Sequence, residues 1–504
     1  MKPSKVYSAE LDGIHAQLIE VEVDINVGLH SFTIVGLADK ALSEAKERVN
    51  AALKNSGLKP PSKENRKITV NLAPADIQKK GSQYDLAIAI GYLFATQQIK
   101  HQAPNDALFI GELALDGSLR PVAGSLSYAL LAQKTGKKTL FLPPDNAKEA
   151  SFIGGLNIIP VSSLFELINH FDGISIITPQ KSTLFESTQK HTVDIADIAG
   201  HEAAKRALMI AAAGGHNILM SGSPGAGKTM LAQALASILP PLSIEEATEV
   251  SQIWGAAGML DGNFISHRPF RSPHHTASSA ALVGGGQNPR PGEISLAHRG
   301  ILFLDELPEF RRDILEALRQ PLEAGSITVS RARKNLHFPA RFTLAAAMNP
   351  CPCGYYGDTE KECTCSAHEV IRYQKKLSGP LLDRIDIQIN VLRVKLEQLE
   401  QKTSQQSSIN VRKHVIRARE RQRQRFTNTS LMTNSEMSSK DCKTYITLTE
   451  NAKQLIRTIF EKKVLSTRTY FRILKISQTI ADLEESDTVG APHIAEAFQL
   501  RIRE

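Results

Sequence analysis

Apolar and polar residues follow spacings that divide the chain into an N-terminal, a central and a C-terminal part. In the N-terminal part, short alternating runs have the period of strands, and apolar residues three or four apart have the period of helices. This mixture indicates an α+β domain, which we expect to span residues 1–172. The predicted strands lie at 21–25, 32–36, 67–72, 140–142 and 158–161, and the predicted helices at 41–53 and 86–94.

In the central part, apolar runs of strand length alternate with helical stretches. A polar segment without periodicity, residues 173–192, precedes it and predicts a linker. Residues 193–398 then show the alternation that is typical of a parallel α/β nucleotide-binding sheet. Residues 399–504 are predicted to be helical. We therefore expect an α/β multidomain protein with an α+β N-terminal domain, an α/β core and a C-terminal helical lid.

A glycine-rich stretch stands between one of these apolar runs and the helical spacing of Leu231, Leu235 and Ile238. It matches G-x-x-x-x-G-K-[ST], the Walker A P-loop, whose backbone N–H groups and helix N-terminus bind phosphate. We expect Lys228 to reach the β- and γ-phosphates of ATP and Thr229 to bind Mg²⁺. The less favoured alternative is a glycine-rich turn before an ordinary helix. The predicted ATP-binding residues are Gly222, Ser223, Pro224, Gly225, Ala226, Gly227, Lys228 and Thr229.

Two carboxylates follow the apolar run 301–304, as in a Walker B strand. Because ligands bind at the carboxyl ends of parallel strands, Asp305 is expected to hold Mg²⁺ and Glu306 to polarise the attacking water as a base. Taken alone, the run fits a buried strand that ends in a helix cap equally well. The P-loop upstream favours the Walker B interpretation.

Three further residues suit a role in hydrolysis. The apolar run 342–348 ends at Asn349, whose amide can orient the lytic water and which matches the sensor 1 element of AAA+ ATPases. Arg384 suits an arginine finger that reaches the neighbouring subunit's γ-phosphate, where transition-state charge gathers. Arg468, near a predicted helix start, fits the sensor 2 arginine. The alternatives are a surface salt bridge for Arg384 and a solvated charge for Arg468.

Several phrases carry a closer resemblance: Arg-Pro-Phe-Arg-Ser-Pro-His-His-Thr at 268–276, Pro-Gly-Glu-Ile-Ser-Leu-Ala-His at 291–298 and Asn-Pro-Cys-Pro-Cys-Gly at 349–354. With them the central part resembles the magnesium-chelatase-type branch of AAA+ proteins, and the whole chain resembles the ComM/YifB family. The resemblance implies a homo-hexamer that translocates on single-stranded or branched DNA. It also implies branch migration during homologous recombination and natural transformation.

The N-terminal part resembles the Lon-protease-like domain of the ribosomal S5 domain 2-like fold, through residues 80–86 and 111–124. The catalytic serine and lysine of a Lon-type peptidase fall on Gln83 and Leu126. Ser82 lies one residue away, but no lysine stands beside Gly124. Because a serine without its base is a weak nucleophile, we expect a structural or DNA-contacting domain.

The net charge of +8 is compatible with a polyanionic partner. Two basic groups are candidate DNA contacts. One lies in the segment between the P-loop helix and residue 301, and the other near the tip of a hairpin predicted at 326–338. A solvated turn is the alternative for the second group, and an exposed lid helix is favoured for the basic run 412–425. The candidate DNA contacts are Arg268, Arg271, Arg331, Arg333 and Lys334.

Four of the five cysteines fall within fifteen residues, in the spacing C-x-C, nine residues, C-x-C. Four thiolates on one short loop can bind Zn²⁺ tetrahedrally. We therefore expect a structural zinc site, with reduced, unmetallated thiols as the alternative, and a packing role for Cys442. The candidate zinc ligands are Cys351, Cys353, Cys363 and Cys365.

No apolar run approaches the roughly 18 residues of a membrane span, and the start lacks a signal-peptide core, so we expect a cytoplasmic protein. The predicted activity is ATP hydrolysis that drives a DNA motor. The main alternative is a magnesium-chelatase-type ATPase that remodels a protein partner. A magnesium chelatase subunit that acts on a tetrapyrrole, an ATP-dependent peptidase and a non-hydrolysing scaffold are weaker alternatives.

Overall fold

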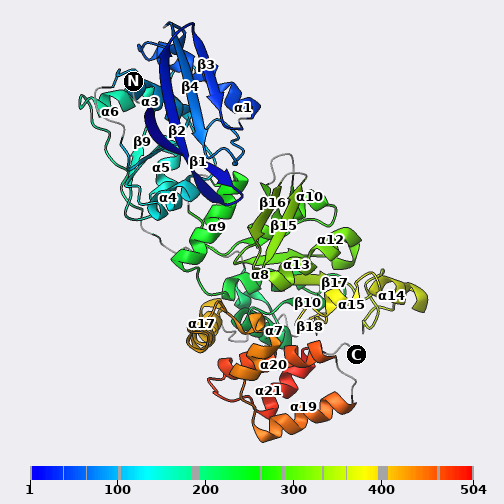
Figure 1. Ribbon diagram of the computed structural model, residues 1–504. Helices are drawn as coiled ribbons and strands as arrows, with labels where there is room; N and C mark the ends of the chain where they lie inside the picture. The colour runs from blue at the N-terminus through cyan, green and yellow to red at the C-terminus, as the bar shows by residue number, and fades with distance from the viewer. Residues whose placement is uncertain are drawn as a thin grey trace. The chain divides into compact units, whose positions relative to one another are not determined.

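The computed structural model forms two compact units (Figure 1). The first contains residues 1–186 and 247–265, and the second contains residues 187–246 and 266–504. None of the described helices is both long and apolar enough to cross a membrane. The residues described are 3–37, 39–63, 65–99, 104–183, 185, 193–260, 264–285, 290–331, 334–358, 360–394, 407–462 and 466–501.

The first unit is built on a four-stranded sheet in the order β1-β2-β4-β3. β2 is antiparallel to β1 and β4, and β3 is parallel to β4. Alternate residues of β2 from Ile19 to Ile25 are buried, as its period-2 pattern predicts, and they face the fully buried helix α3. The elements are β1 (Ser4–Asp12), β2 (His15–Val27), β3 (Ser31–Val35), β4 (Arg66–Ala73) and α3 (Asp85–Ala95).

A three-stranded parallel sheet, β5-β8-β9, completes the first unit. The strands predicted at 140–142 and 158–161 are confirmed. Helix α9 also belongs to this unit from Ala247 onward, although it follows the P-loop helix in the chain. The elements are β5 (Ala107–Phe109), β6 (Glu112–Leu113), β7 (Leu119–Arg120), α4 (Ser125–Lys134), β8 (Thr139–Leu142), α5 (Pro144–Ala150), β9 (Asn157–Pro160), α6 (Leu164–Phe171) and α9 (Ile244–Ala257).

The helix predicted at 41–53 is confirmed except at Glu44, where the structure divides it into α1 (Lys40–Ser43) and α2 (Ala45–Asn55). Asp39 caps the first turn. Its carboxylate accepts a hydrogen bond from the Leu42 N–H (2.8 Å), and its carbonyl accepts one from Ser43 Oγ (2.9 Å). A serine side chain that bonds back to the carbonyl four residues earlier slightly destabilises a helix and often bends it.

The second unit contains a five-stranded parallel sheet in the order β11-β14-β17-β10-β18. β14 and β17 are buried along their whole length, because helices cover both faces of such a sheet. The central position of β10 and β17 places their carboxyl ends side by side. The strands are β10 (Ile218–Ser221), β11 (Phe270–Arg271), β14 (Ile301–Leu304), β17 (Thr343–Met348) and β18 (Ile387–Asn390), and α7 (Glu202–Gly214) and α8 (Lys228–Ile238) flank β10 in sequence.

The predicted hairpin is present as β15 (Ser326–Arg331) and β16 (Lys334–Pro339), which pair from Ser326 and Pro339 to Arg331 and Lys334. Arg333 lies outside the described residues. Short elements connect the remaining strands: α10 (Ser279–Val283), β12 (Gly284–Gly285), β13 (Arg290–Pro291), α11 (Glu293–Leu296), α12 (Arg312–Ala317), α13 (Arg319–Ala324), α14 (Ala367–Gln374) and α15 (Gly379–Leu382).

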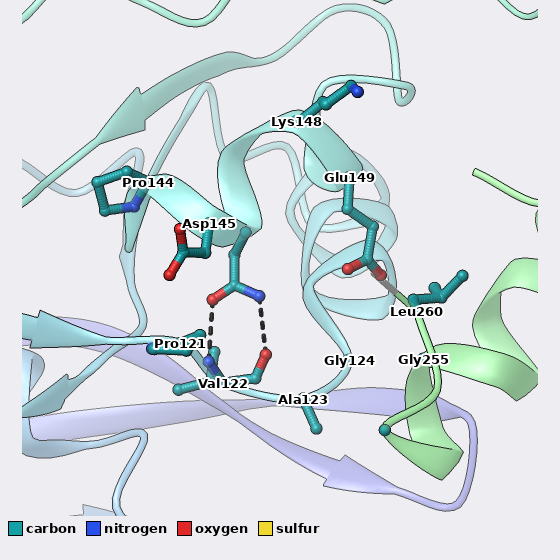
Figure 2. Close-up of a pocket in the computed structure, with 12 residues that line it drawn as sticks. Pro121, Val122, Ala123, Gly124, Pro144, Asp145, Lys148, Glu149, Gly255 and Leu260 are labelled. Atoms are coloured by element: carbon teal, nitrogen blue, oxygen red, sulfur yellow. Dashed lines mark hydrogen bonds between the residues drawn. The ribbon is translucent and has the colours of Figure 1, made fainter. Parts of the chain in front are cut away.

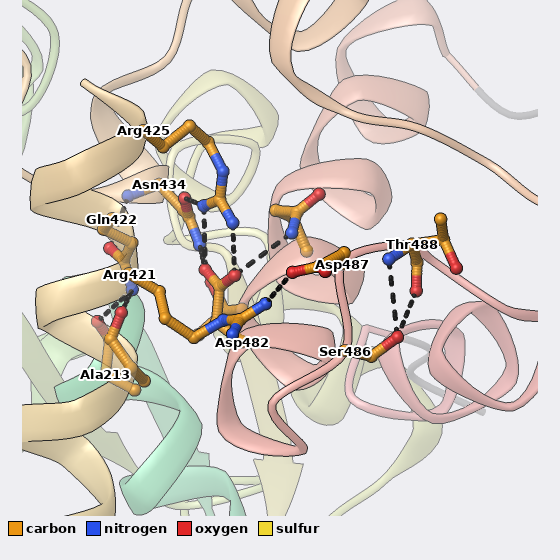
Figure 3. A network of polar contacts seen from close by, with 12 residues as sticks. Ala213, Arg421, Gln422, Arg425, Asn434, Asp482, Ser486, Asp487 and Thr488 are labelled. Carbon is orange, nitrogen blue, oxygen red and sulfur yellow. Dashed lines mark hydrogen bonds and ion pairs between the residues drawn. The ribbon is translucent and has the colours of Figure 1, made fainter. Parts of the chain in front are cut away.

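The C-terminal part is helical, as predicted, and packs on α7 and α8 through a shared apolar core. The basic helix α17 is not simply exposed, because Val411, Val415 and Ala418 are buried and Arg419 donates to the carbonyl of Ala212 (2.8 Å). Figure 3 shows the polar network that joins it to α20. The helices are α17 (Ser408–Arg425), α18 (Ser439–Tyr445), α19 (Glu450–Lys462), α20 (Thr467–Leu483) and α21 (Ala491–Gln499).

Candidate functional site

The P-loop connects β10 to α8, as its sequence predicts. Gly225 (φ 78°) and Gly227 (φ 83°) adopt the left-handed conformation that glycine tolerates best. A Cβ on Gly222 would lie 2.2 Å from the carbonyl oxygen of Val391, so only glycine fits there. The loop can therefore present its backbone N–H groups and the N-terminus of α8 to an anion.

Lys228 links the P-loop to the neighbouring strand β17. Its Nζ donates to the carbonyls of Gly222 (2.7 Å) and Ser223 (3.0 Å) and to Oδ1 of Asn349 (3.1 Å). Burial lowers the pKa of Lys228, while Asp305 and Glu306 oppose this effect. The predicted phosphate-binding lysine and the predicted sensor amide thus share one site.

Thr229 and Asp305 link the start of α8 to the end of β14. Thr229 Oγ1 donates to Oδ2 of Asp305 across 3.2 Å, and both side chains are accessible. A hydroxyl and a carboxylate oxygen are hard ligands of the kind that Mg²⁺ prefers. These residues fit a magnesium ion that is shared with nucleotide phosphates.

Glu306 adopts a left-handed backbone conformation (φ 51°), which is uncommon outside glycine. Its Oε2 lies 3.4 Å from Nδ1 of His275, whose ring packs against that of His274 at a centroid distance of 4.1 Å. The sequence pattern predicts no part for His275 in hydrolysis. Its position four residues after β11, the strand that pairs with β14, is the available signal for this contact.

Arg384 and Arg468 lie together around Glu323. Both guanidinium groups pair with Oε1 of Glu323, at 3.5 Å for Arg468. Arg384 is buried and also donates to the carbonyl of Pro380 (2.7 Å). Among the described residues, neither arginine forms a hydrogen bond or ion pair with Lys228 or Asp305.

The four clustered cysteines converge after β17, with their Sγ atoms within 4.8 Å of one another. Cys351 Sγ lies 3.3 Å from Cys353 Sγ and 3.6 Å from Cys363 Sγ, and Cys353 N donates to Cys365 Sγ (3.4 Å). Zn–S bonds of about 2.3 Å in a tetrahedron give S···S separations of about 3.8 Å. The cluster therefore fits a zinc ion.

The candidate DNA contacts differ in their surroundings. Arg268 is paired with Glu246 (2.9 Å) and donates to the carbonyl of Arg299 (2.6 Å). Arg271 forms two hydrogen bonds of 2.6 Å with Glu293. The guanidinium groups of Arg268 and Arg271 are therefore paired with carboxylates of the same chain. Arg331, in contrast, lies at the end of the hairpin. Only the hairpin is carried into the proposal below.

The positions that match the peptidase residues form no serine–lysine pair. Gln83 Nε2 donates to Oε2 of Glu10 (3.0 Å), and Leu126 is fully buried. The neighbouring Ser82 hydroxyl pairs instead with Glu112. Burial lowers the pKa of Lys79, whose amine donates to the carbonyl of Pro74. These contacts give the serine no base.

A pocket of ≈ 670 Å³ lies beside Gly124 in the first unit (Figure 2). Glu149 lines it, accepting hydrogen bonds from Ser125 Oγ (2.5 Å) and Leu126 N (3.3 Å) at the start of α4, and burial raises the pKa of Glu149. Gly255 of α9 closes one side, because a Cβ there would lie 3.2 Å from Glu149 Oε1. Helix α9 thus lies beside Glu149 and Gly124 at the start of α4.

Known families match most of the chain. The family described as Magnesium chelatase, subunit ChlI, matches residues 194–399. Two related families, Subunit ChlI of Mg-chelatase and Magnesium chelatase, subunit ChlI C-terminal, match residues 21–146 and 405–501. The mixed α/β fold with a magnesium-chelatase-like AAA+ core is therefore as predicted.

Individual relatives extend over the full length. Competence protein ComM of Haemophilus influenzae is 43% identical over 98% of this chain and 97% of its own. The protein YifB of Escherichia coli is 41% identical over 99% of this chain and 97% of its own. Lon protease of Azorhizobium caulinodans is 26% identical over 31% of this chain and 19% of its own.

Proposed function

Because the chain belongs to the ComM/YifB family of magnesium-chelatase-like AAA+ proteins, we propose that it is an ATP-driven hexameric DNA translocase. It promotes branch migration during homologous recombination and natural transformation. One observation carries the ATPase half of the proposal. Lys228 and Thr229 of one loop contact Asn349 and Asp305 at the ends of two neighbouring strands.

Each residue of that arrangement has a part in hydrolysis. Lys228 and the loop N–H groups bind the β- and γ-phosphates, and Asn349 holds Lys228 in place. Thr229 and Asp305 would hold Mg²⁺, which would neutralise phosphate charge. Glu306 takes a proton from water as the water oxygen bonds to the γ-phosphorus, the bond to ADP breaks and phosphate leaves.

The DNA half rests on the relative named ComM and on the hairpin β15–β16. Its strands pair as far as Arg331 and Lys334, and the sequence from 331 to 334 is Arg-Ala-Arg-Lys. Basic side chains on a narrow projection contact phosphates without reading bases. The proposed contacts are Arg331, Arg333 and Lys334. A hexamer is proposed because an arginine finger, here Arg384, acts on the site of a neighbouring subunit.

The proposed cofactors are ATP and Mg²⁺, with Zn²⁺ bound by the four cysteines of the cluster. Zinc binding requires the thiols to lose their protons and couples metal affinity to loop folding. Elemental analysis of the purified protein is expected to give one zinc per chain. Protein free of metal after purification without chelators would contradict this assignment.

The test of the main proposal is ATP hydrolysis with and without single-stranded and branched DNA. Wild-type turnover is expected to rise with DNA, and Glu306→Gln is expected to lose about 10²- to 10⁴-fold in rate while still binding ATP. Glu309→Gln, an exposed partner of Lys376, is the matched control and should hydrolyse ATP normally. Neutralising the hairpin tip should remove the DNA stimulation and leave basal turnover unchanged.

A second candidate is a magnesium-chelatase-type ATPase that remodels a protein partner. It is supported by the three magnesium chelatase families that match the chain. Turnover that is lost in Glu306→Gln but indifferent to every DNA would exclude the translocase and favour this candidate.

A further inference from the structure

The cysteine loop lies directly against the P-loop. Gly354, between the two cysteine pairs, has a φ of 87°, and a Cβ on it would lie 2.6 Å from Cδ and 2.7 Å from Cγ of Pro224. Farther along the same loop, Asp358 is hydrogen-bonded to the Ser223 side chain. Two adjacent residues of the predicted phosphate-binding loop therefore contact the loop that carries the cysteines.

The same loop is anchored at its other end to the predicted sensor residue. Cys351, which is fully buried, follows Asn349 by two residues, and Asn349 accepts the hydrogen bond from Lys228. Gln374 of α14 donates to the intervening Pro350 carbonyl (3.2 Å). Movement of the cysteine cluster would therefore displace both the P-loop and the amide that holds its lysine.

Packing alone cannot hold this loop. Of its described residues between 351 and 365, only Cys351 and Gly354 are buried. Arg393 pairs with Asp358 at 3.6 Å and with Glu360 at 3.7 Å. The Asp358 side chain is only 6% accessible, whereas Glu360 is exposed and its pair has small energetic value. A loop without an apolar core requires a cross-link to stay ordered, and a metal ion bound by its four thiolates supplies one.

We propose that zinc bound by Cys351, Cys353, Cys363 and Cys365 fixes this loop as a wall of the phosphate-binding loop, so that metal occupancy sets the affinity for ATP. The inference rests on the proposed ATPase function and adds metal control of the same site. Gly354 and Asp358 are positioning residues, because they act through Pro224 and Ser223. Without metal, ATP binding must order the loop, and that cost lowers the affinity.

The test measures zinc content and the Kd of a fluorescent ATP analogue with Mg²⁺. The double variant Cys363→Ser, Cys365→Ser is expected to lose zinc and to bind about 10-fold more weakly, the factor that corresponds to about 1.4 kcal/mol of ordering. Cys442→Ser, at a buried cysteine outside the cluster, is the control and should keep both zinc and affinity. Thermal unfolding of every variant verifies folding at the temperature of the assay.

Substitutions at two glycines distinguish the effect of the Gly354–Pro224 contact on ATP affinity from the effect of the metal. Gly354→Ala should keep zinc but raise the Kd about 10-fold, because its methyl group displaces Pro224. Gly357→Ala is the matched control, since Gly357 has a similar φ of 76° in the same loop but its Cβ would meet nothing within 4 Å. Both variants carry similar backbone strain, so a difference between their Kd values measures the effect of the contact with Pro224.

A conservative variant provides the rescue. Cys363→His keeps four zinc ligands and should restore the wild-type Kd. Wild-type affinity in the zinc-free double variant, or equal Kd values for Gly354→Ala and Gly357→Ala, overturns the coupling while leaving the ATPase proposal intact. Iron in place of zinc overturns the zinc assignment. A wild-type protein that binds zinc but no ATP overturns the ATPase function and the coupling together.

Discussion

Glu306 illustrates at the scale of one residue how the backbone and a neighbour place a carboxylate. Its left-handed conformation has a cost of about 1–3 kcal/mol for a residue other than glycine. The strain persists because β14 is buried before it and a short 3-10 helix, Leu307–Glu309, follows. The carboxylate is thereby held 3.4 Å from His275. His275 is therefore the side chain that we expect to help orient Glu306.

Replacing His275 tests this assignment. His275→Ala is expected to lower kcat for ATP about 10- to 100-fold and to change KM little, because a misplaced base affects the reaction more than nucleotide binding. His368→Ala, at an exposed position on α14, is the control. Steady-state kinetics of both variants make the comparison, and an unchanged kcat in His275→Ala would remove His275 from the site.

The spacing of residues in the sequence predicts much of this site. The rest of the site depends on contacts between segments that are far apart in the chain. The P-loop and the two carboxylates are visible because each motif lies within a few consecutive residues and marks a strand end. The pairing of Arg384 with Glu323 and of His275 with Glu306 joins residues more than thirty positions apart. No local pattern reports such contacts. The roles of the site residues remain predictions.

His216 is a fully buried residue whose titration should be visible in stability. Its Nε2 is hydrogen-bonded to Thr479 Oγ1 (2.8 Å), and its Nδ1 lies 3.6 Å from Asp386. Burial lowers the pKa of His216, although Asp386 opposes the shift. In the unfolded chain the imidazole takes up its proton near pH 6.5. Between that pH and the lower folded pKa, the unfolded state therefore binds more protons.

The free energy of unfolding should consequently fall as the pH drops below about 6.5, by at most about 1.4 kcal/mol per pH unit for this group. Urea unfolding at pH 7.5, 6.5 and 5.5 measures the slope. Burial also lowers the pKa of His170 and His201, so the comparison uses the difference between wild type and His216→Gln. Identical slopes in the two proteins would show that His216 does not contribute.

At the scale of elements, the lid is attached to the core by buried polar contacts as well as apolar packing. Figure 3 shows Arg425 of α17 reaching Asp482 of α20, with Asn434 between them. Gln422 donates to the carbonyl of Ala213 at the end of α7 (2.9 Å). The sequence predicts α17 as a basic helix, but it does not reveal which arginines face inward.

Two ion pairs of this network permit a matched comparison. Asp482→Ala removes a buried partner of Arg425 and should lower the free energy of unfolding by about 3–5 kcal/mol. Asp487→Ala removes an exposed partner of Arg421, with 92% of its side chain accessible, and should cost at most about 1 kcal/mol. Chemical denaturation distinguishes the two, and equal losses would contradict the burial argument.

At the scale of the whole molecule, the two units do not follow the chain in a simple order. Residues 247–265 lie in the sequence of the ATPase core but belong structurally to the first unit. Phe264, at the end of this insertion, packs its ring against Phe152 at a centroid distance of 4.5 Å. The sequence predicts a domain boundary near residue 172. It does not predict that residues 247–265 rejoin the first unit, because α9 has an ordinary helical pattern.

Phe264→Ala tests how firmly the insertion is held. Loss of the buried ring should destabilise the first unit by about 3–5 kcal/mol and expose 247–265 to protease. Phe165→Ala, whose ring is 59% exposed on α6, is the control. Limited proteolysis followed by mass spectrometry locates the first cuts. Unchanged cleavage within 247–265 would show that Phe152 and Phe264 contribute little to docking.

The returning segment also has a consequence for the order of synthesis. The ribosome synthesises residues 1–186 first. The residues of 247–265 that close the pocket beside Gly124 are made only after residues 187–246. At about 5–20 residues per second, the nascent domain waits for several seconds with that face uncovered. A fragment that stops at residue 186 would retain this unfinished surface permanently. Completion of the N-terminal domain is therefore timed by the translation of the ATPase that follows it.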